Sequence, residues 1–368
     1  MNVLVLGTDK NAFISGSETE KRFKKYSELV SELNFIIKTS KNDGYGFKDF
    51  NNLKLHPTNN RLKFLFLLSF LAIGRRVLKN SEDFLISSQD PFECGLMAYF
   101  LARRKKLPLH IQVHTDFMNE AFRKESTINS IRFFIGKFVL RRATEIRVVS
   151  SRIKDSIISL GIHPEKISVL PIWTDEKSFH NTASNFNLKE KYKNFDYIIL
   201  MASRIEVEKN FKLALEVLNE IMKNGGVSGN SKILLLIVGD GSLKINLDKK
   251  IRELNLYNNV VIEKWTNDLT PYYKGADLLL LTSNYEGFGR TIIEAMASGC
   301  PVISTDVGVA KEVGAEIIPY EPIEASMAVL RQLKTHSRIK KFKNPYSLTS
   351  KEYLDKYLES WSKCFKFR

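Results

Sequence analysis

One stretch, residues 277–305, constrains the fold more than any other part of this sequence; it reads DLLLLTSNYEGFGRTIIEAMASGCPVIST. Its four consecutive leucines, residues 278–281, form an apolar run of the length of a buried strand. Residues 291–297 then place apolar side chains at helical spacing, and Gly299 and Pro301 end that helix before a second apolar run begins. The order strand, loop, helix, strand is the building unit of a parallel α/β sheet.

The loop inside this stretch carries Gly287 and Gly289 next to the start of the helix. A helix N-terminus offers backbone N–H donors and a partial positive charge to a phosphate, and glycines allow the phosphate to come close. Two carboxylates, Glu286 and Glu294, bracket the loop and helix, and sugar hydroxyls are groups that such carboxylates bind. The residues alone leave two interpretations open: a nucleotide-sugar site, or a solvated helix residue beside ordinary turn glycines.

Two cations follow an earlier apolar run, residues 197–202. Arg204 comes directly after that predicted strand, and Lys209 stands at the start of a predicted helix over residues 211–222. The planar fork of Arg and the point charge of Lys suit a diphosphate. The alternative is an exposed pair that interacts with the neighbouring glutamates.

The first half of the chain alternates predicted strands and helices, which indicates a doubly wound α/β domain. Its first strand is followed by Gly7-Thr-Asp-Lys, which lacks the G-x-G-x-x-G pattern of dinucleotide-binding proteins and disfavours an oxidoreductase. A later strand, residues 109–113, ends at His114 and Asp116. Ligands of open α/β sheets collect at strand C-termini, so both residues are candidates for a site; a hydrogen-bonded bystander is the alternative for His114.

At 368 residues the chain is long enough for two domains, and its 43% hydrophobic and 26% charged residues are typical of a globular protein. Three widely spaced cysteines without a C-x-x-C pair indicate a reducing compartment, and we find no metal-binding motif. The N-terminus lacks the basic start and long apolar run of a signal peptide, and the run at residues 64–73 is too short to span a membrane. We therefore expect a cytoplasmic protein.

The net charge of +15 is unevenly distributed: residues 1–170 carry 28 Lys and Arg against 17 Asp and Glu. A basic half suits an anionic membrane surface, a lipid diphosphate or nucleic acid. Two predicted helices in it, residues 60–80 and 128–142, combine large apolar residues with Arg and Lys. They are either buried helices with snorkelling ends or helices that lie in a membrane interface.

The segment from Glu286 to Glu294 resembles the E-x7-E signature of family 4 glycosyltransferases of the GT-B fold. The resemblance continues through the motifs ASR (residues 202–204), EKN (208–210), IVGDG (237–241) and DVG (306–308). It implies two Rossmann-like, doubly wound α/β domains that face a cleft. We expect an N-terminal, acceptor-side domain over residues 1–172 and a nucleotide-sugar-binding domain over 173–345, with the boundary inside 170–187. A C-terminal helix over 349–365 is expected to pack back on the first domain.

The resemblance also implies a function: retaining transfer of a sugar from a UDP- or GDP-linked donor to a lipid-linked sugar or polysaccharide, with no metal or other cofactor. Arg204 and Lys209 would hold the diphosphate, Glu294 the ribose, and Glu286 would lie near the donor sugar. His114 would lie over that sugar, with Asp116 on the acceptor side. The remaining expected donor contacts are Gly287, Phe288, Gly289 and Arg290 at the phosphates, and Gly239 and Trp265 near the base.

We expect the protein to work at the inner face of the cell membrane as a peripheral protein, and not to bind nucleic acid. Two other interpretations stay open. One is a different GT-B enzyme, such as a nucleotide-sugar epimerase or hydrolase. The other is a non-catalytic module that binds sugar or nucleic acid.

Overall fold

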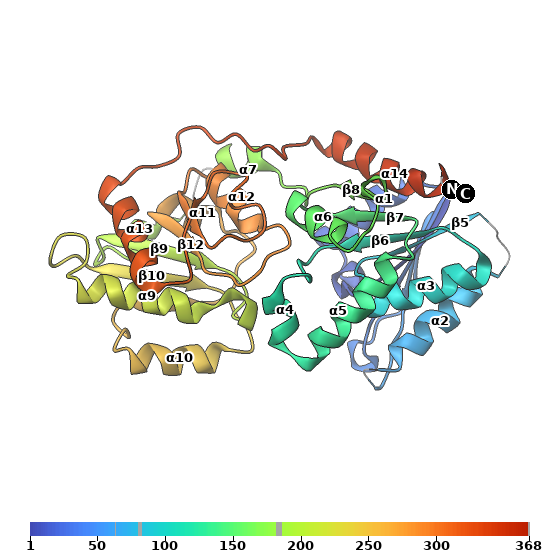
Figure 1. Cartoon of the computed structure of the whole chain (residues 1–368), viewed down its shortest axis with the longest axis horizontal. Coiled ribbons are helices and arrows are strands. Elements are labelled where there is room, and N and C mark those ends of the chain that lie inside the picture. Colours follow the sequence, from blue (N-terminus) through green and yellow to red (C-terminus); the bar gives the residue numbers. More distant parts are fainter. Residues whose placement is uncertain (63, 80–82, 182–185, 367–368) are drawn as a thin grey trace. The chain divides into compact units, whose positions relative to one another are not determined.

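Two sheets of mainly parallel strands, each with its own helices and core, organise the chain in the computed structural model, which describes residues 1–62, 64–79, 83–181 and 186–366 (Figure 1). Unit 1 consists of Met1–Pro171 together with Leu348–Arg368, and unit 2 of Ile172–Ser347. The chain therefore leaves unit 1 after Pro171 and returns to it with its last helix.

The described residues of unit 1 form a sheet of eight strands in the order β3-β4-β2-β1-β5-β6-β7-β8. Neighbouring strands are parallel except β3 and β4, which are antiparallel. The central strands are apolar on both faces because helices cover both faces. The strands are β1 (Asn2–Gly7), β2 (Glu32–Ile37), β3 (Lys48–Phe50), β4 (Leu53–Pro57), β5 (Phe84–Ser88), β6 (Leu109–Val113), β7 (Glu145–Val148) and β8 (Ile167–Val169).

The helices of unit 1 pack on these two faces; α3 contacts both α2 and α5, and α14 lies against β6 and β7. Helix α14 begins with a capping box, in which Thr349 and Glu352 bond each other's backbone N–H groups. Its apolar stripe, including Tyr353, Tyr357 and Trp361, is buried in the core with residues of α1 and β1. The helices are α1 (Glu18–Ser27), α2 (Phe66–Val77), α3 (Glu93–Lys105), α4 (Glu120–Glu125), α5 (Thr127–Leu140), α6 (Ser151–Ile158) and α14 (Ser350–Lys366).

In unit 2, the described residues form a sheet of six strands in the order β11-β10-β9-β12-β13-β14, and every neighbouring pair is parallel. The strands are β9 (Tyr197–Ala202), β10 (Ile233–Val238), β11 (Val260–Glu263), β12 (Leu278–Leu281), β13 (Val302–Ser304) and β14 (Glu316–Ile317). The helices are α7 (Glu176–Asn181), α8 (Leu188–Lys191), α9 (Phe211–Lys223), α10 (Lys244–Glu253), α11 (Thr270–Gly275), α12 (Arg290–Ala297) and α13 (Pro322–Thr335).

The sequence prediction was wrong at two helices of unit 1. The helical spacing of apolar residues over residues 18–33 predicts one helix to Leu33, but α1 ends at Ser27, because the chain turns there and Leu33 pairs with Val3 in the sheet. The predicted helix over residues 60–80 begins only at Phe66, since Asn60 instead bridges to Ser40. Its last residue, Asn80, lies outside the described part of the chain.

Cys94, Cys300 and Cys364 are buried free thiols. Within the residues that the structure describes, we find no helix with the length and apolarity needed to cross a membrane.

Candidate functional site

The strand order of unit 2 changes direction between β9 and β12. Strands β10 and β11 lie on one side of β9, whereas β12, β13 and β14 lie on its other side. Ligands of open α/β sheets bind at the carboxyl ends of the strands that flank such a point. Arg204 lies two residues beyond the end of β9, and Thr282 directly follows β12. The motif residues of unit 2 therefore gather at the position where the fold favours a ligand.

Lys209 and Glu286 meet at this edge of the sheet. Lys209 Nζ lies 2.5 Å from Glu286 Oε1, and each side chain is only 14% exposed. Ser283 Oγ donates a second hydrogen bond to the same oxygen, at 2.8 Å. The structure thus joins two predicted site residues that are 77 positions apart in the sequence.

Backbone hydrogen bonds fix the loops that carry this pair. Asn210 adopts a left-handed conformation, with φ 47°, and its side-chain oxygen caps α9 by accepting from Leu213 N–H. Thr282 Oγ1 donates to the carbonyl oxygens of Lys209 and Asn210, and Asn284 N–H donates to Glu208 O. The loop after β9 and the loop after β12 therefore hold each other in position.

Arg204 lies at the surface, where its side chain is 73% exposed and donates to Glu208 Oε1 at 2.7 Å. The same loop is tied to the turn after β10, because Glu206 accepts hydrogen bonds from the backbone N–H and hydroxyl of Ser242. Gly239 in that turn touches the loop closely: a Cβ there would lie 1.9 Å from Ser203 O. A larger residue at Gly239 would separate the two loops.

Glu294 lies in the second turn of α12 and is buried. Arg290 Nε donates to its Oε1 at 2.5 Å, and Tyr273 Oη donates to its Oε2 at 3.0 Å. Burial, followed by the nearby Glu294 charge, raises the pKa of Tyr273 well above its ordinary value, so the phenol stays a donor. The Glu294 carboxylate is thus held in one orientation.

The N-terminus of α12 directly follows the loop that carries Glu286. Gly289 is its N-cap in a left-handed conformation, with φ 85°, and contributes no side chain that would cover the first turn. Phe288 is buried and packs edge-on against Tyr346, while its carbonyl accepts from Val309 N–H. Gly287, Gly289 and Phe288 therefore form the buried base of the loop, with Arg290 exposed above it.

Trp265 follows a strand that is separated by β10 from β9, the strand that precedes Arg204 and Lys209. It follows β11, the edge strand beyond β10, and is 48% exposed.

His114 and Asp116 belong to unit 1 and lie at the carboxyl end of β6, next to β5. His114 Nε2 lies 3.2 Å from Gln112 Oε1, and burial together with the Arg147 charge lowers the pKa of His114 to about 3. Asp116 is 7% exposed, its pKa is raised by burial, and its Oδ1 has no hydrogen-bond partner among the described residues.

Some side chains that hydrogen-bond to the side chains of predicted site residues were not anticipated, among them Ser283, Tyr273 and Gln112. Ser283 comes two residues after the apolar run of β12, and a polar residue at the carboxyl end of a predicted strand could have been recognised as a site candidate from the sequence. Tyr273 reaches Glu294 across 21 positions, and no local pattern marks that contact.

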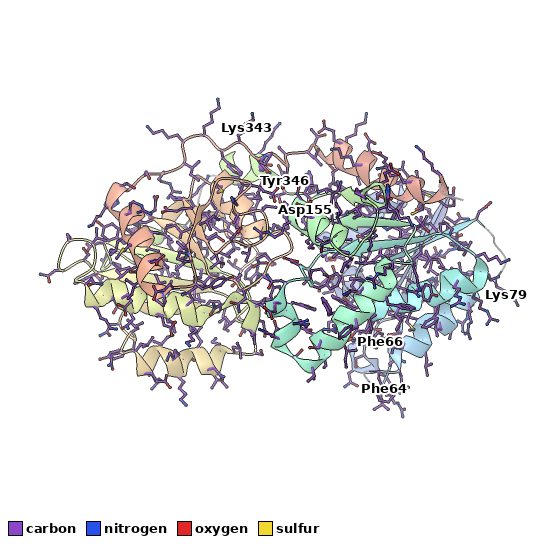
Figure 2. The ribbon with its side chains drawn as sticks, viewed as in Figure 1. Phe64, Phe66, Lys79, Asp155, Lys343 and Tyr346 are labelled. Atoms are coloured by element: carbon purple, nitrogen blue, oxygen red, sulfur yellow. The ribbon has the colours of Figure 1, made fainter. Side chains whose placement is uncertain are left out.

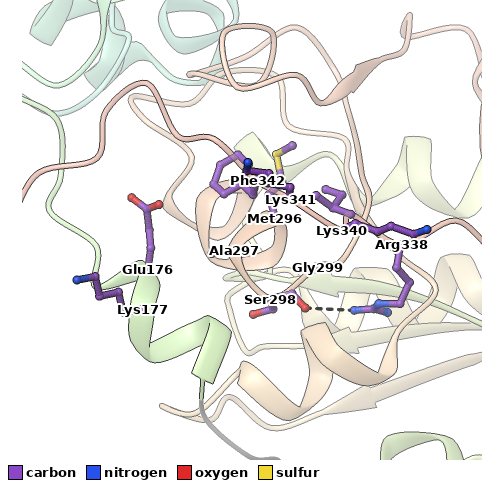
Figure 3. Close-up of a pocket in the computed structure, with 11 residues that line it drawn as sticks. Glu176, Lys177, Met296, Ala297, Ser298, Gly299, Arg338, Lys340, Lys341 and Phe342 are labelled. Carbon is purple, nitrogen blue, oxygen red and sulfur yellow. Dashed lines mark hydrogen bonds between the residues drawn. The ribbon is translucent and has the colours of Figure 1, made fainter.

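A hollow of about 450 Å³ lies at the opposite end of α12 (Figure 3). It is lined by the end of that helix, by α7 and by the segment that follows α13. Arg338 in it donates to the carbonyl oxygens of Ala276, Tyr273 and Ser298, so this cation holds the ends of α11 and α12. None of the sequence-predicted site residues lines the hollow.

Two family models match the chain on either side of the unit boundary. The model described as Glycosyltransferase Family 4 matches residues 36–177, and the model described as Glycosyl transferases group 1 matches residues 184–316. The chain belongs to this family of group 1, family 4 glycosyltransferases. Its two α/β units, each built on a sheet of mainly parallel strands, have the GT-B fold.

Curated relatives carry glycosyltransferase names. An Escherichia coli protein named UDP-Gal:alpha-D-GlcNAc-diphosphoundecaprenol alpha-1,3-galactosyltransferase is 25% identical over 65% of this chain and 62% of its own length. A Streptococcus pneumoniae protein named alpha-monoglucosyldiacylglycerol synthase is 25% identical over 62% of this chain and 53% of its own length. The chain thus spans little more than half of the length of these relatives.

Among solved structures, Anabaena HepE in complex with UDP and glucose has a TM-score of 0.71 at 17% identity, and the match covers 100% of this chain and 99% of that one. At this identity the likeness establishes the fold.

Proposed function

We propose that the protein is a retaining hexosyltransferase that moves a sugar from a UDP-linked donor to a lipid-linked saccharide or growing polysaccharide. The observation that carries this proposal is the Lys209–Glu286 pair at the switch point of the second sheet, with Arg204 beside it. The names of the E. coli relative and of the HepE complex favour UDP over GDP, and the E. coli name favours an acceptor built on a polyprenyl diphosphate.

Lys209 and Arg204 bind the donor diphosphate in this proposal. As the bond between the sugar and the diphosphate breaks, negative charge grows on the phosphate oxygens, and two nearby cations neutralise it. The N–H groups at the start of α12 add partial positive charge on the same side. These groups take the role that a metal ion would otherwise fill, so we propose that the donor site needs no metal.

Glu294 accepts hydrogen bonds from the ribose hydroxyls, using lone pairs that Arg290 and Tyr273 leave open, since each carboxylate oxygen accepts more than one bond. When the donor binds, Glu286 gives up part of its contact with Lys209 and contacts the donor sugar instead. His114 and Asp116 act on the sugar and acceptor side from unit 1. The base lies toward Gly239 and Trp265.

We further propose that unit 1 binds the cytoplasmic face of an anionic membrane through one surface, the α2–α3–α5 face. Large apolar side chains are exposed on it or just before it: Phe64, Leu68, Phe100, Ile128, Ile131 and Phe134. Phe64 lies at the outer edge of the unit and points away from it (Figure 2). Exposed apolar residues of this size, grouped on one surface, indicate an interaction site.

Cations surround these apolar residues. Arg75, Arg103 and Arg104 line a hollow of about 600 Å³ between α2 and α3, together with Leu71 and Phe100. Arg142 lies 3.6 Å from the centre of the Phe138 ring at the end of α5. An apolar surface bordered by Arg and Lys suits the interface of an anionic bilayer, where a lipid-linked acceptor would be found.

The donor half of the proposal is tested by thermal stabilisation with UDP, GDP, ADP and CMP. At about 100 times its dissociation constant, a bound nucleotide stabilises the protein by about 2.7 kcal/mol. We expect UDP to stabilise most. The transfer half is tested with a UDP-hexose labelled in the sugar and GlcNAc-diphosphoundecaprenol in anionic vesicles.

Label is expected in the lipid fraction. Release of free hexose at the same rate with and without acceptor would identify a hydrolase instead, and no stabilisation by any nucleotide would contradict the donor site. Lys212→Ala is a matched control for Lys209→Ala, because Lys212 lies in the first turn of α9, three residues after Lys209, is 70% exposed and forms its ion pair with Glu216.

A further inference from the structure

Arg147 is a buried cation that the proposed reaction leaves unexplained. It lies on β7, is 3% exposed, and its hydrogen bonds go to neutral acceptors. Nη1 donates to Gln112 Oε1 at 2.8 Å, and Nη2 donates to Leu170 O at 3.2 Å and Tyr353 Oη at 3.0 Å. Burying a charge without a counter-charge is costly, so a role beyond packing is expected.

The bond from Arg147 determines how the Gln112 amide is oriented. A guanidinium only donates, so the amide atom that faces Arg147 must be the oxygen. The amide nitrogen then points the other way, where it donates to Tyr357 Oη at 3.1 Å and lies 3.4 Å from Ser87 Oγ. Both of these hydroxyls can accept.

The oriented amide in turn determines the protonation of His114. Its Nε2 lies 3.2 Å from the same Gln112 oxygen, which only accepts, so Nε2 must carry a proton. A neutral imidazole carries one proton, and Nδ1 is then left with its lone pair. The charged groups that face the ring are Arg147 on β7 and Arg22 on α1, and both oppose a second proton.

We propose that Arg147 is a positioning residue that acts through Gln112 to hold His114 as the neutral Nε2–H tautomer, with Nδ1 as a hydrogen-bond acceptor for a substrate hydroxyl. The last clause rests on the proposed function; the tautomer does not. Helix α14 helps to hold Arg147 and Gln112 in place. Its Tyr353 hydroxyl bonds to Arg147 and its Tyr357 hydroxyl to Gln112, and the centres of the two rings lie 5.8 and 4.8 Å from the Arg147 guanidinium.

The tautomer is measured on the full chain by long-range ¹H–¹⁵N correlation of the imidazole nitrogens near neutral pH, with His114→Gln used to assign the signal. We expect a pyrrole-like Nε2 and a pyridine-like Nδ1. Gln112→Leu removes the link, and the spectrum should move to a mixture of tautomers. Gln112→Glu keeps an acceptor at this position, so Nε2–H should persist while the negative charge raises the His114 pKa.

Tyr357→Phe is the matched control, because it removes a partner from the nitrogen side of the amide and leaves the oxygen side intact; its spectrum should match that of the parent. His110, which bonds Ser87 Oγ through Nδ1, is an internal reference. A protonated Nδ1 in the parent chain, or an unchanged His114 signal in Gln112→Leu, would overturn the proposal.

Kinetics separate this inference from the proposed function. Gln112→Leu should lower kcat by about tenfold, the effect of one hydrogen bond, with UDP affinity unchanged. Gln112→Glu should recover part of the loss at high pH, where the ring is neutral again. A correct tautomer in a chain that transfers no sugar would leave the positioning role in place and contradict only the proposed function. An equal kcat in Gln112→Leu and parent would overturn the acceptor role of Nδ1.

Discussion

Lys209 Nζ and Glu286 Oε1 lie 2.5 Å apart, so the cation assigned to the diphosphate is already neutralised by a carboxylate of the same site. An incoming diphosphate must compete with Glu286 for Lys209. We therefore predict that Glu286→Gln binds UDP severalfold more tightly while sugar transfer falls, because a neutral amide holds Lys209 less strongly. Calorimetry with UDP measures the affinity. Weaker UDP binding in this variant would contradict the competition.

The two cations are expected to act together on the leaving diphosphate. Lys209→Ala combined with Arg204→Ala should lower kcat/KM by more than two decades, since each such contact contributes roughly 2–4 kcal/mol to the transition state. Steady-state rates with a UDP-hexose provide the measurement, and Lys212→Ala should retain the parent rate. Near-normal turnover in a folded double variant would remove these residues from the site.

Glu294 should affect nucleotide binding more than Glu286 does. Glu294→Gln keeps the shape of the buried side chain but weakens its bonds to ribose hydroxyls, so affinity for UDP should fall together with turnover. Tyr273→Phe removes one of the bonds that orient Glu294 and tests whether orientation alone accounts for the loss. Calorimetry with UDP and with uracil separates the ribose contact from the base. Equal UDP affinity in Glu294→Gln and the parent would rule out the ribose role.

The second sheet was predictable where apolar runs are continuous and are separated by Gly and Pro. The strand at Leu278–Leu281 and the helix that ends before Gly299 are confirmed within one residue. The prediction that the first helix reaches Leu33 was wrong because Leu29, Val30 and Leu33 continue the helical spacing of apolar residues past the turn at Ser27. Apolar spacing alone does not indicate where a turn ends the helix. The short strands β3 and β4 were missed, since three and five residues give too short a pattern to distinguish a strand from a loop.

The candidate site was predicted as a set of residues but not as a set of contacts. Motif spacing indicated Lys209 and Glu286 separately, yet nothing in the sequence pairs them, since the loops that bring them together are fixed by backbone bonds such as Asn284 N–H to Glu208 O. Gln112 and Arg147 were missed for a related reason. They lie in strands that read as ordinary, and their partners come from a helix more than 200 positions away.

Glu145 gives a pH dependence of stability. It is buried on β7, and burial raises its pKa to about 7, although Ser168 donates a hydrogen bond to it. The folded state therefore keeps a proton that the unfolded state loses near pH 4.3, and the folding free energy contributed by Glu145 declines from about pH 4.3 to 7. Glu145→Gln should raise Tm at pH 8 and not at pH 4. The exposed Glu28→Gln is the control, and an equal gain at both pH values would contradict the assignment.

The basic side chains of the α2–α3–α5 face should determine membrane binding. Arg75, Arg76, Arg141 and Arg142 are exposed there, and each cation near an anionic surface contributes about 1 kcal/mol. Replacing all four with Gln should abolish co-sedimentation with phosphatidylglycerol vesicles and leave UDP affinity unchanged, because the donor residues belong to unit 2. Salt should release the parent protein, since the screening length at 0.1 M is about 10 Å. A matched variant replaces four exposed unit 2 lysines, Lys334, Lys340, Lys341 and Lys343, with Gln and should still bind. Equal loss in both variants would mean that net charge, and not this face, holds the protein at the membrane.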